Sequence, residues 1–255
     1  MDSICATTKA PMKKLTHCIG FLLSMIAASS AIAANEAVDR PQLQVGDTWT
    51  YRQTADTKAG FKEERLTYTL TRVTAKTLYM DQHQDGSNQP PRSVVYASDW
   101  SRMRSVNGVE TVVSEPLNFP LSPNKTWQLH FREERPNPQR AWEDWTNDFV
   151  VVGHETVKVG AGEFDAIKIE AEGKWRSEVV ASSQVSSAAQ GASGNATISS
   201  TVASTAPYQI EGRIYKAFWY VPAVKRWVKV VEETYSTTGV RYERSVHELE
   251  SFNVH

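Results

Sequence analysis

The chain has 255 residues, of which 22% are charged, 40% hydrophobic and 10% aromatic. This balance excludes an intrinsically disordered chain and a helical membrane protein, and the length fits one globular domain or two small ones. The formal net charge of −1 leaves no electrostatic footprint for nucleic acid, so we exclude that class of partner.

The first 33 residues predict a secretory signal peptide. Residues 12–14 (Met-Lys-Lys) are a short cationic start, residues 19–27 form an apolar stretch, and residues 31–33 (Ala-Ile-Ala) are a small-x-small cleavage site. Residues 1–11 carry none of these features, so we expect Met12 to be the initiator. A membrane anchor is the less favoured alternative, because the apolar run is shorter than the ~20 residues that span a bilayer. We therefore expect a periplasmic or secreted protein.

Both cysteines, Cys5 and Cys18, lie in the segment expected to be removed. The mature chain is then predicted to have no thiol, no disulfide and no cysteine-based metal site or nucleophile. Acylation of Cys18 is disfavoured, because the apolar region follows this cysteine instead of preceding it. Without residues 1–33 the chain keeps 25 basic and 28 acidic residues, a formal charge of −3.

From Gly46 onward the sequence predicts one strand after another. Leu66, Tyr68 and Leu70 alternate with polar residues, a period of two that is typical of a strand with one buried face. Further strands are expected at 48–53, 76–82, 92–97, 109–113, 127–133, 147–159, 164–175, 211–221, 226–235 and 240–252. Turn-forming residues separate several of them, at 85–88, 160–162, 222–225 and 237–239.

These strands predict an all-β or β-dominated fold over residues 34–255. We expect a strongly curved antiparallel sheet or half-open barrel, whose last 90 residues form a meander of neighbouring hairpins.

The segment 179–210 contains no charged residue and is rich in Ser, Ala and Thr. It is either a low-complexity linker or the two arms of one long hairpin with its tip at 191–195. Folding back at about residue 192 places Ile167 near Phe218, and we favour this hairpin with a mobile tip. Such a segment can also offer a surface to a partner, although a solvated loop is the simpler interpretation.

Residues able to perform acid–base chemistry form no recognisable catalytic or metal-binding motif. The histidines after residue 33 are His83, His130, His154, His247 and His255, and no two of them have a metal-ligand spacing. Adjacent carboxylates occur at 63–64, 133–134, 143–144 and 232–233, and neighbours on a strand face opposite ways. Carboxylates from different strands can still converge. We assign no catalytic, cofactor-binding or metal-ligating residue, and we expect no cofactor.

Eight tryptophans are many for a chain of this size: Trp49, Trp100, Trp127, Trp142, Trp145, Trp175, Trp219 and Trp227. Filling a core is the default interpretation, and lining an apolar cavity or stacking on sugars is the alternative. Trp142 and Trp145 lie in a polar segment expected to be a loop. Lys225, Arg226 and Lys229 are interrupted by apolar residues and are interpreted as the solvated face of a strand.

Three stretches carry a family resemblance: residues 45–51 (VGDTWTY), 157–170 (VKVGAGEFDAIKIE) and 218–229 (FWYVPAVKRWVK). Together they resemble a group of uncharacterised exported bacterial proteins related in architecture to the LolA and LolB lipoprotein carriers. The resemblance covers about a third of the mature chain. It implies a LolA-like curved sheet in which the Gly-x-Phe-x-Ala strand and the Trp-Tyr-x-Pro-x-x-x-Arg-Trp-Val hairpin are neighbours, and it brings no catalytic residue.

We therefore expect a non-enzymatic exported protein that binds an apolar or lipid-like ligand on a concave aromatic-lined face, or that maintains the cell envelope. Two alternatives stay open. An outer-membrane β-barrel needs strands with a continuous lipid-facing apolar stripe. A hydrolase of envelope glycans needs two converging carboxylates. After removal of the signal peptide no stable membrane span is expected.

Overall fold

The computed structural model describes residues 37–190 and 197–255, with side chains left undescribed at 182–190 and 197–204. All of these residues fall in one compact unit, Asn35–His255. The predicted signal peptide, with both cysteines and the expected initiator, lies outside the described residues.

The described residues are almost entirely β-structure, and the single helix among them is the short 3-10 helix η1 (Pro222–Val224). The strands are β1 (Thr48–Thr57), β2 (Gly60–Val73), β3 (Thr77–Gln84), β4 (Arg92–Ala97), β5 (Arg102–Val106), β6 (Val109–Ser114), β7 (Thr126–Asn137), β8 (Arg140–Val159), β9 (Gly162–Val179), β10 (Ser182–Gln190), β11 (Thr197–Thr205), β12 (Tyr208–Val221), β13 (Arg226–Ser236) and β14 (Arg241–Asn253). No helix long and apolar enough to cross a membrane occurs in this part of the chain.

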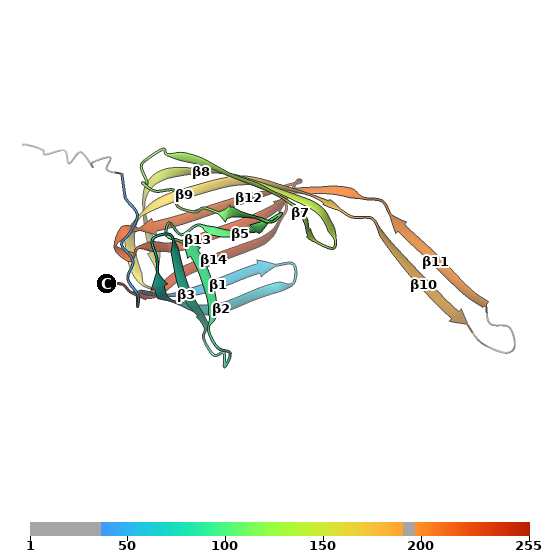
Figure 1. Ribbon diagram of the computed structural model, residues 1–255, viewed down its shortest axis with the longest axis horizontal. Helices are drawn as coiled ribbons and strands as arrows, with labels where there is room; N and C mark the ends of the chain where they lie inside the picture. The colour runs from blue at the N-terminus through green and yellow to red at the C-terminus, as the bar shows by residue number, and fades with distance from the viewer. Residues whose placement is uncertain (1–36, 191–196) are drawn as a thin grey trace, which may run out of the picture. The chain divides into compact units, whose positions relative to one another are not determined.

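Ten strands form one antiparallel sheet in the order β4-β3-β2-β1-β14-β13-β12-β9-β8-β7. Figure 1 shows this sheet curling around its inner face. The sheet ends at β4 and β7, which do not pair with each other, so it is not closed into a barrel. The predicted fold class, a curved antiparallel sheet, is confirmed. The predicted meander is also present, because β9, β12, β13 and β14 are successive neighbours.

The β5–β6 hairpin lies between the two ends of the sheet. The amide of Ala97, the last residue of β4, donates to the carbonyl of Ser101, which directly precedes β5 (2.8 Å). This bond keeps the hairpin beside β4. On the other side, Arg104 Nη1 donates to Glu133 Oε1 of β7 (2.7 Å). Sequence reasoning missed β5, because all but the last of its residues are exposed and show no alternation of apolar and polar side chains.

Strands β9 and β12 continue into β10 and β11 without a change of register. Val179 pairs with Tyr208, and Ser182 pairs with Thr205. The residues expected to form hairpin arms are therefore paired along one long ribbon. Ile167 lies opposite Tyr220 instead of Phe218, which is two residues from the expected pairing. The expected tip, 191–195, lies outside the described residues.

The inner face of the sheet is divided into an apolar and a polar part. Because side chains alternate along a strand, every second residue of each strand points inward. Towards η1 these inward residues are buried and apolar, as at Leu70 and Leu249, and Leu117 and Leu121 from the segment before β7 pack on them. Further along the same two strands the inward residues are polar, as at Glu64 and His247. The core therefore occupies only one part of the concave face.

Trp142 and Trp145 do not lie in a loop, as the sequence predicted, but in β8. This prediction is wrong because a strand near the end of a sheet can carry polar residues on both of its faces when both faces are partly solvated. Trp145 pairs with Trp175 of β9 and stacks on it, with ring centroids 6.1 Å apart. The other side of the Trp145 ring stacks on Phe131 of β7 (6.4 Å). We call Phe131, Trp145 and Trp175 the aromatic ladder.

Candidate functional site

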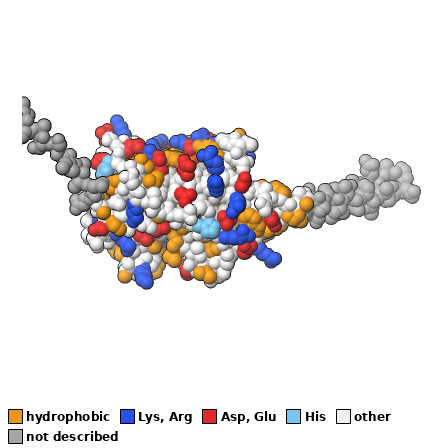
Figure 2. Space-filling model, turned by 90° about the horizontal axis from the view of Figure 1, so that it is seen from above, with side chains coloured by type: hydrophobic (Ala, Val, Ile, Leu, Met, Phe, Trp, Pro, Cys, Tyr) orange, Lys and Arg blue, Asp and Glu red, His pale blue; other side chains and the backbone are white. Residues whose placement is uncertain are grey.

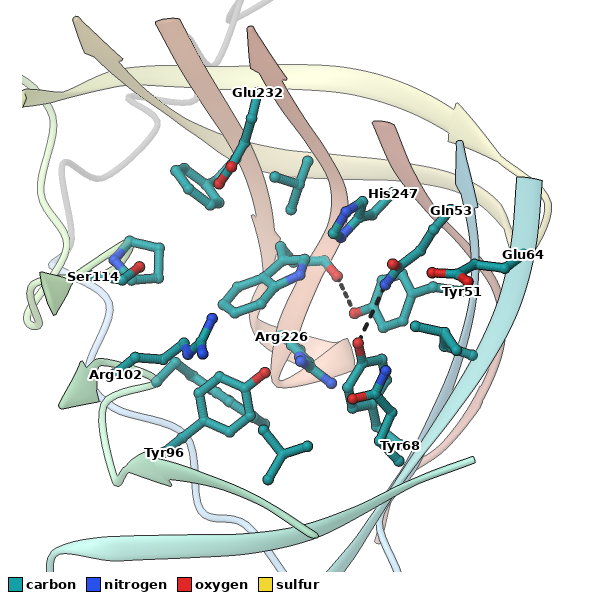
Figure 3. Close-up of a pocket in the computed structure, with 18 of the residues that line it drawn as sticks. Tyr51, Gln53, Glu64, Tyr68, Tyr96, Arg102, Ser114, Arg226, Glu232 and His247 are labelled. Carbon is teal, nitrogen blue, oxygen red and sulfur yellow. Dashed lines mark hydrogen bonds between the residues drawn. The ribbon is translucent and has the colours of Figure 1, made fainter. Parts of the chain in front are cut away.

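A cavity of about 410 Å³ opens where the apolar part of the inner face meets the polar part (Figure 3). Its walls come from β1 to β4, from β12 to β14 and from the segment that carries the β5–β6 hairpin. This volume lies within the range of about 300–1,000 Å³ that is typical of small-molecule sites. The curvature of one sheet therefore brings residues from both halves of the sequence to one hollow.

The aromatic floor of the cavity packs on the turn between β12 and β13. Pro222 starts η1, and Lys225 ends it in the left-handed conformation (φ 63°), so that β13 begins at the next residue. Aromatic side chains fix the backbone of this turn. Trp49 Nε1 donates to the carbonyl of Val224 (2.9 Å), and Trp100 Nε1 donates to that of Lys225 (3.1 Å). The next residue, Arg226, is thereby held in place.

Arg226 is buried under aromatic rings, with only 2% of its surface exposed. Its guanidinium carbon lies 4.6 Å from the ring centroid of Tyr68, 4.7 Å from that of Trp100 and 4.8 Å from that of Trp227. The guanidinium carbon also lies 5.3–5.7 Å from the ring centroids of Trp49, Tyr51 and Tyr96. Each ring face attracts the cation through its quadrupole. We call these six rings the aromatic cage.

The charge of Arg226 has no polar partner in the described part of the chain. Its Nε and Nη1 atoms are buried and make no hydrogen bond, and no carboxylate lies within ion-pair distance. Burial of an unpaired charge is unfavourable, because the protein does not replace the lost hydration. The cage offsets part of this cost, and the group still lines the cavity.

The interpretation of Lys225, Arg226 and Lys229 as a solvated strand face is therefore wrong for Arg226. It also fails for Lys225, whose side chain is 15% exposed and forms an ion pair with the fully buried Asp47 (3.4 Å). The error arises because β13 is covered on both faces near η1, so that a basic residue there is enclosed whichever way it points. Figure 2 shows what a solvated face looks like elsewhere, with basic and acidic side chains intermingled.

The upper wall of the cavity carries charged groups of both signs (Figure 3). Glu64 and Glu232 line it from β2 and β13, and each has a lysine partner, Lys62 (2.7 Å) and Lys216 (3.3 Å) respectively. Arg92 donates to Gln82 (2.9 Å). These residues surround the aromatic floor with hydrogen-bonding groups.

His247 also lines the upper wall, from β14. Burial is the main cause that lowers the pKa of its imidazole below the ordinary value of 6.5, and nearby Arg226 lowers it further, while Glu232 acts in the opposite direction. The neutral imidazole is therefore favoured near pH 7. Among the side chains of the floor, burial raises the pKa of the Tyr51 and Tyr68 hydroxyls, which stay protonated.

Two hydroxyl groups of the aromatic cage take part in hydrogen bonds within the protein. Tyr51 donates to the carbonyl of Trp227 (2.6 Å), and Gln53 Nε2 donates to the hydroxyl oxygen of Tyr68 (3.2 Å). Figure 3 shows these two bonds beside Arg226. They fix two rings of the cage and leave the guanidinium between them.

The other histidines lie apart from the cavity lining. His130, His154 and His255 each contact a carboxylate, at 3.3, 3.0 and 3.4 Å. No group of three or more His, Asp or Glu side chains suited to a metal ion occurs in the described residues. Of the adjacent carboxylate pairs, only Glu64 and Glu232 contribute to the cavity lining.

Arg226 was not predicted to be a functional residue, although it lies in the stretch 218–229 that carries the family resemblance. The available signal was an arginine between aromatic strand residues, directly after a proline turn. That pattern places a cation at a position where the neighbouring side chains form a core.

Neither a protein-family model nor a curated protein matched this chain. Among solved structures, a candidate lipoprotein from Parabacteroides distasonis matches with a TM-score of 0.46 and 14% identity over 86% of this chain and 100% of that chain. A candidate exported protein with a YmcC-like fold from Bacteroides fragilis matches with a TM-score of 0.41 and 16% identity over the same shares.

At these identities and TM-scores, neither likeness carries an argument about the ligand or location of this chain. The resemblance to the LolA and LolB carriers stays a prediction.

Proposed function

We propose that this protein is an exported, non-enzymatic binding protein that holds a compact amphiphilic ligand on the inner face of its sheet. The observation that carries the proposal is the cavity of about 410 Å³, which has an aromatic floor and a polar upper wall. Such a combination of apolar surface with a few placed polar groups is typical of ligand sites.

The lining favours a ligand of limited size. Leu66, Val94 and Phe218 offer apolar contact beside the cage. The rest of the apolar inner face is already occupied by the protein's own side chains, such as Leu117 and Leu121, which are at most 1% exposed. A long acyl chain therefore has little room there, and we refine the expected lipid-like ligand to a compact amphiphile.

The proposal of export is supported by the N-terminal sequence. Residues 12–33 combine the cationic start, the apolar stretch and the small-residue cleavage site of a signal peptide. Osmotic shock of cells that express the full chain tests it. We expect release of a protein that begins at Ala34, whereas retention in the cytosol or in the membrane fraction would contradict export.

The non-enzymatic part of the proposal is supported by the two glutamates of the cavity. A glycan hydrolase needs one protonated carboxyl group as the acid and one charged carboxylate. Glu64 and Glu232 are each held in an ion pair with a lysine, Lys62 (2.7 Å) and Lys216 (3.3 Å), instead of facing each other as a free pair. Activity lost on Glu232→Gln with an envelope glycan as substrate would favour the hydrolase instead.

Ligand binding is tested with N-phenyl-1-naphthylamine, a neutral apolar dye whose fluorescence rises in an apolar environment. Val94 points into the cavity, and its neighbour Val95 on the same strand is 49% exposed on the other face. We expect Val94→Trp to fill the cavity and weaken dye binding at least about tenfold, and Val95→Trp to leave it unchanged. Absence of dye binding to the unaltered protein, or equal binding by both variants, would refute the proposed site.

A further inference from the structure

The cavity contains more positive charge than the protein itself neutralises. Three arginines line it, Arg92, Arg102 and Arg226, and none of them has a carboxylate within ion-pair distance in the described part of the chain. The two glutamates that line the same cavity are paired with Lys62 and Lys216, which lie outside the lining. The charge that remains unneutralised in the cavity is therefore positive.

Arg226 is the deepest of the three arginines. Only 2% of its surface is exposed, and two of its nitrogens, Nε and Nη1, lack any acceptor. Arg92 and Arg102 are exposed and line the cavity from β4 and β5. An arginine that is kept enclosed without an anion is unfavourable for folding alone, because each unsatisfied donor adds a desolvation cost.

We infer that the ligand carries an oxyanion, a carboxylate or a phosphate, which pairs with the guanidinium of Arg226 while its apolar part lies against the aromatic floor. This inference rests on the proposed function and names the chemistry of its ligand. A guanidinium presents its N–H donors as a planar fork that matches the oxygens of such groups, and the surrounding rings exclude water from the pair.

The two outer arginines extend the same arrangement. Arg102 lies at the start of β5 and Arg92 at the start of β4, and both are exposed members of the cavity lining, where an anion in solution can reach them. Charges so placed raise the local concentration of an anionic ligand and favour its entry in the orientation that leads the anion to Arg226.

The test compares two dyes with the same aromatic body. 8-Anilino-1-naphthalenesulfonate carries an anion, and N-phenyl-1-naphthylamine lacks it. We expect the unaltered protein to bind the anionic dye at least about tenfold more tightly than the neutral dye, and Arg226→Gln to reduce this ratio to about one. Arg72→Gln is the matched control, because Arg72 stacks on Tyr79 (3.6 Å) and lies outside the cavity lining. It should keep the original ratio.

A second variant serves if Arg226→Gln fails to fold by circular dichroism. The double variant Arg92→Gln/Arg102→Gln changes only exposed side chains and should lower the ratio severalfold. Equal binding of both dyes by the unaltered protein would overturn the inference and leave the proposed function intact. Failure of both dyes to bind would overturn the proposed function as well.

The source of the anion is distinguished by competition. Octyl phosphate should displace the anionic dye at concentrations at which inorganic phosphate does not. Equal displacement by inorganic phosphate would show a site for a free anion and would contradict the amphiphilic ligand.

Discussion

The aromatic cage and the aromatic ladder are built from the same residue types on the inner face of one sheet, yet they differ in what they enclose. The cage surrounds the unpaired guanidinium of Arg226 with six rings. In the ladder, Phe131, Trp145 and Trp175 stack on one another and remain partly exposed.

The charges beside the ladder are paired. On the face of the ladder Glu133 accepts from Arg104. On the opposite face of the same strands Arg132 pairs with Glu134 (2.8 Å) while its guanidinium lies over Trp142 (4.3 Å). Rings that are stacked among neutralised charges need no ligand to account for them. The comparison therefore teaches that the cavity is distinguished less by its aromatic residues than by the unneutralised cation they enclose.

The largest effect is expected from removing a ring of the cage. Trp100 is completely buried, packs edge-to-face on Trp49 (5.5 Å) and holds the η1 turn. Trp100→Ala should lower the free energy of unfolding by about 3–5 kcal/mol. Trp145→Ala in the ladder should cost less than half as much, because its ring is already partly solvated. Urea unfolding of both variants measures the difference, and equal losses would remove the distinction between the two clusters.

A smaller effect is expected from crowding the ladder. A Cβ atom added at Gly212 would lie 2.5 Å from Trp175 Nε1 and 2.5 Å from the carbonyl oxygen of Tyr235. Gly212→Ala should therefore destabilise the protein by about 1–3 kcal/mol. In a Trp175→Ala background part of this loss of stability should disappear. The thermal midpoints of the unaltered protein, the two single variants and the double variant measure the difference. A loss that does not depend on Trp175 would show that the ring is free to move away.

The polar wall of the cavity predicts a pH dependence through His247. Its pKa is lowered in the folded protein, so as the pH falls through 6.5 the unfolded chain binds the proton first and stability declines. One such group contributes at most about 1.4 kcal/mol per pH unit. His247→Gln should flatten the stability curve between pH 7 and 5, and the exposed His154→Gln should not. An unchanged slope in His247→Gln would contradict the burial of this ring.

The acidic side chains act in a lower pH window. Their ion-pair and hydrogen-bond partners lower the pKa of Glu248 and Glu250 from the ordinary value of 4.5, although burial acts in the opposite direction. The stability that these groups contribute is present above that value and is lost below it. Between pH 7 and 5 His247 acts against Glu115, whose pKa is raised mainly by burial and whose protonation in the folded protein favours stability as the pH falls.

The smallest effect is expected at the ion pair that joins the β5–β6 hairpin to β7. Arg104 is 44% exposed in this pair with Glu133. Arg104→Ala should cost about 0.2–1 kcal/mol, less in high salt, because solvent screens an exposed pair. Thermal unfolding at low and high ionic strength measures this. A loss as large as that of Trp100→Ala would mean that the hairpin depends on this contact.

The strands could be predicted from the sequence because their patterns are local. Alternation at Leu66, Tyr68 and Leu70 and the turn residues at 160–162 identify strands and hairpins without knowledge of their partners. β4 was predicted with its observed bounds, Arg92–Ala97, whereas β8 begins at Arg140 instead of at residue 147. The position at which a strand ends depends on how far the neighbouring strand continues to pair with it, and the residues of the strand itself do not show this.

The site could not be predicted, because it depends on pairings across the whole chain. Arg226 looked solvated when only its neighbours in sequence were considered. Its burial arises because Trp49, Tyr68 and Trp100 come from segments more than 120 residues earlier, and only the sheet order brings them over the β12–β13 turn. Curvature, which decides what meets across the concave face, leaves no signature of its own in the sequence.

The most direct test of an anion at Arg226 is the side-chain Nε–Hε resonance of this arginine in a ¹⁵N-labelled protein. Its Nε is buried, so its proton should exchange slowly with water and remain visible near pH 7. We predict that octyl phosphate shifts this resonance, while octanol at the same concentration does not. An Arg226 resonance that stays in place while octyl phosphate binds elsewhere would contradict the account.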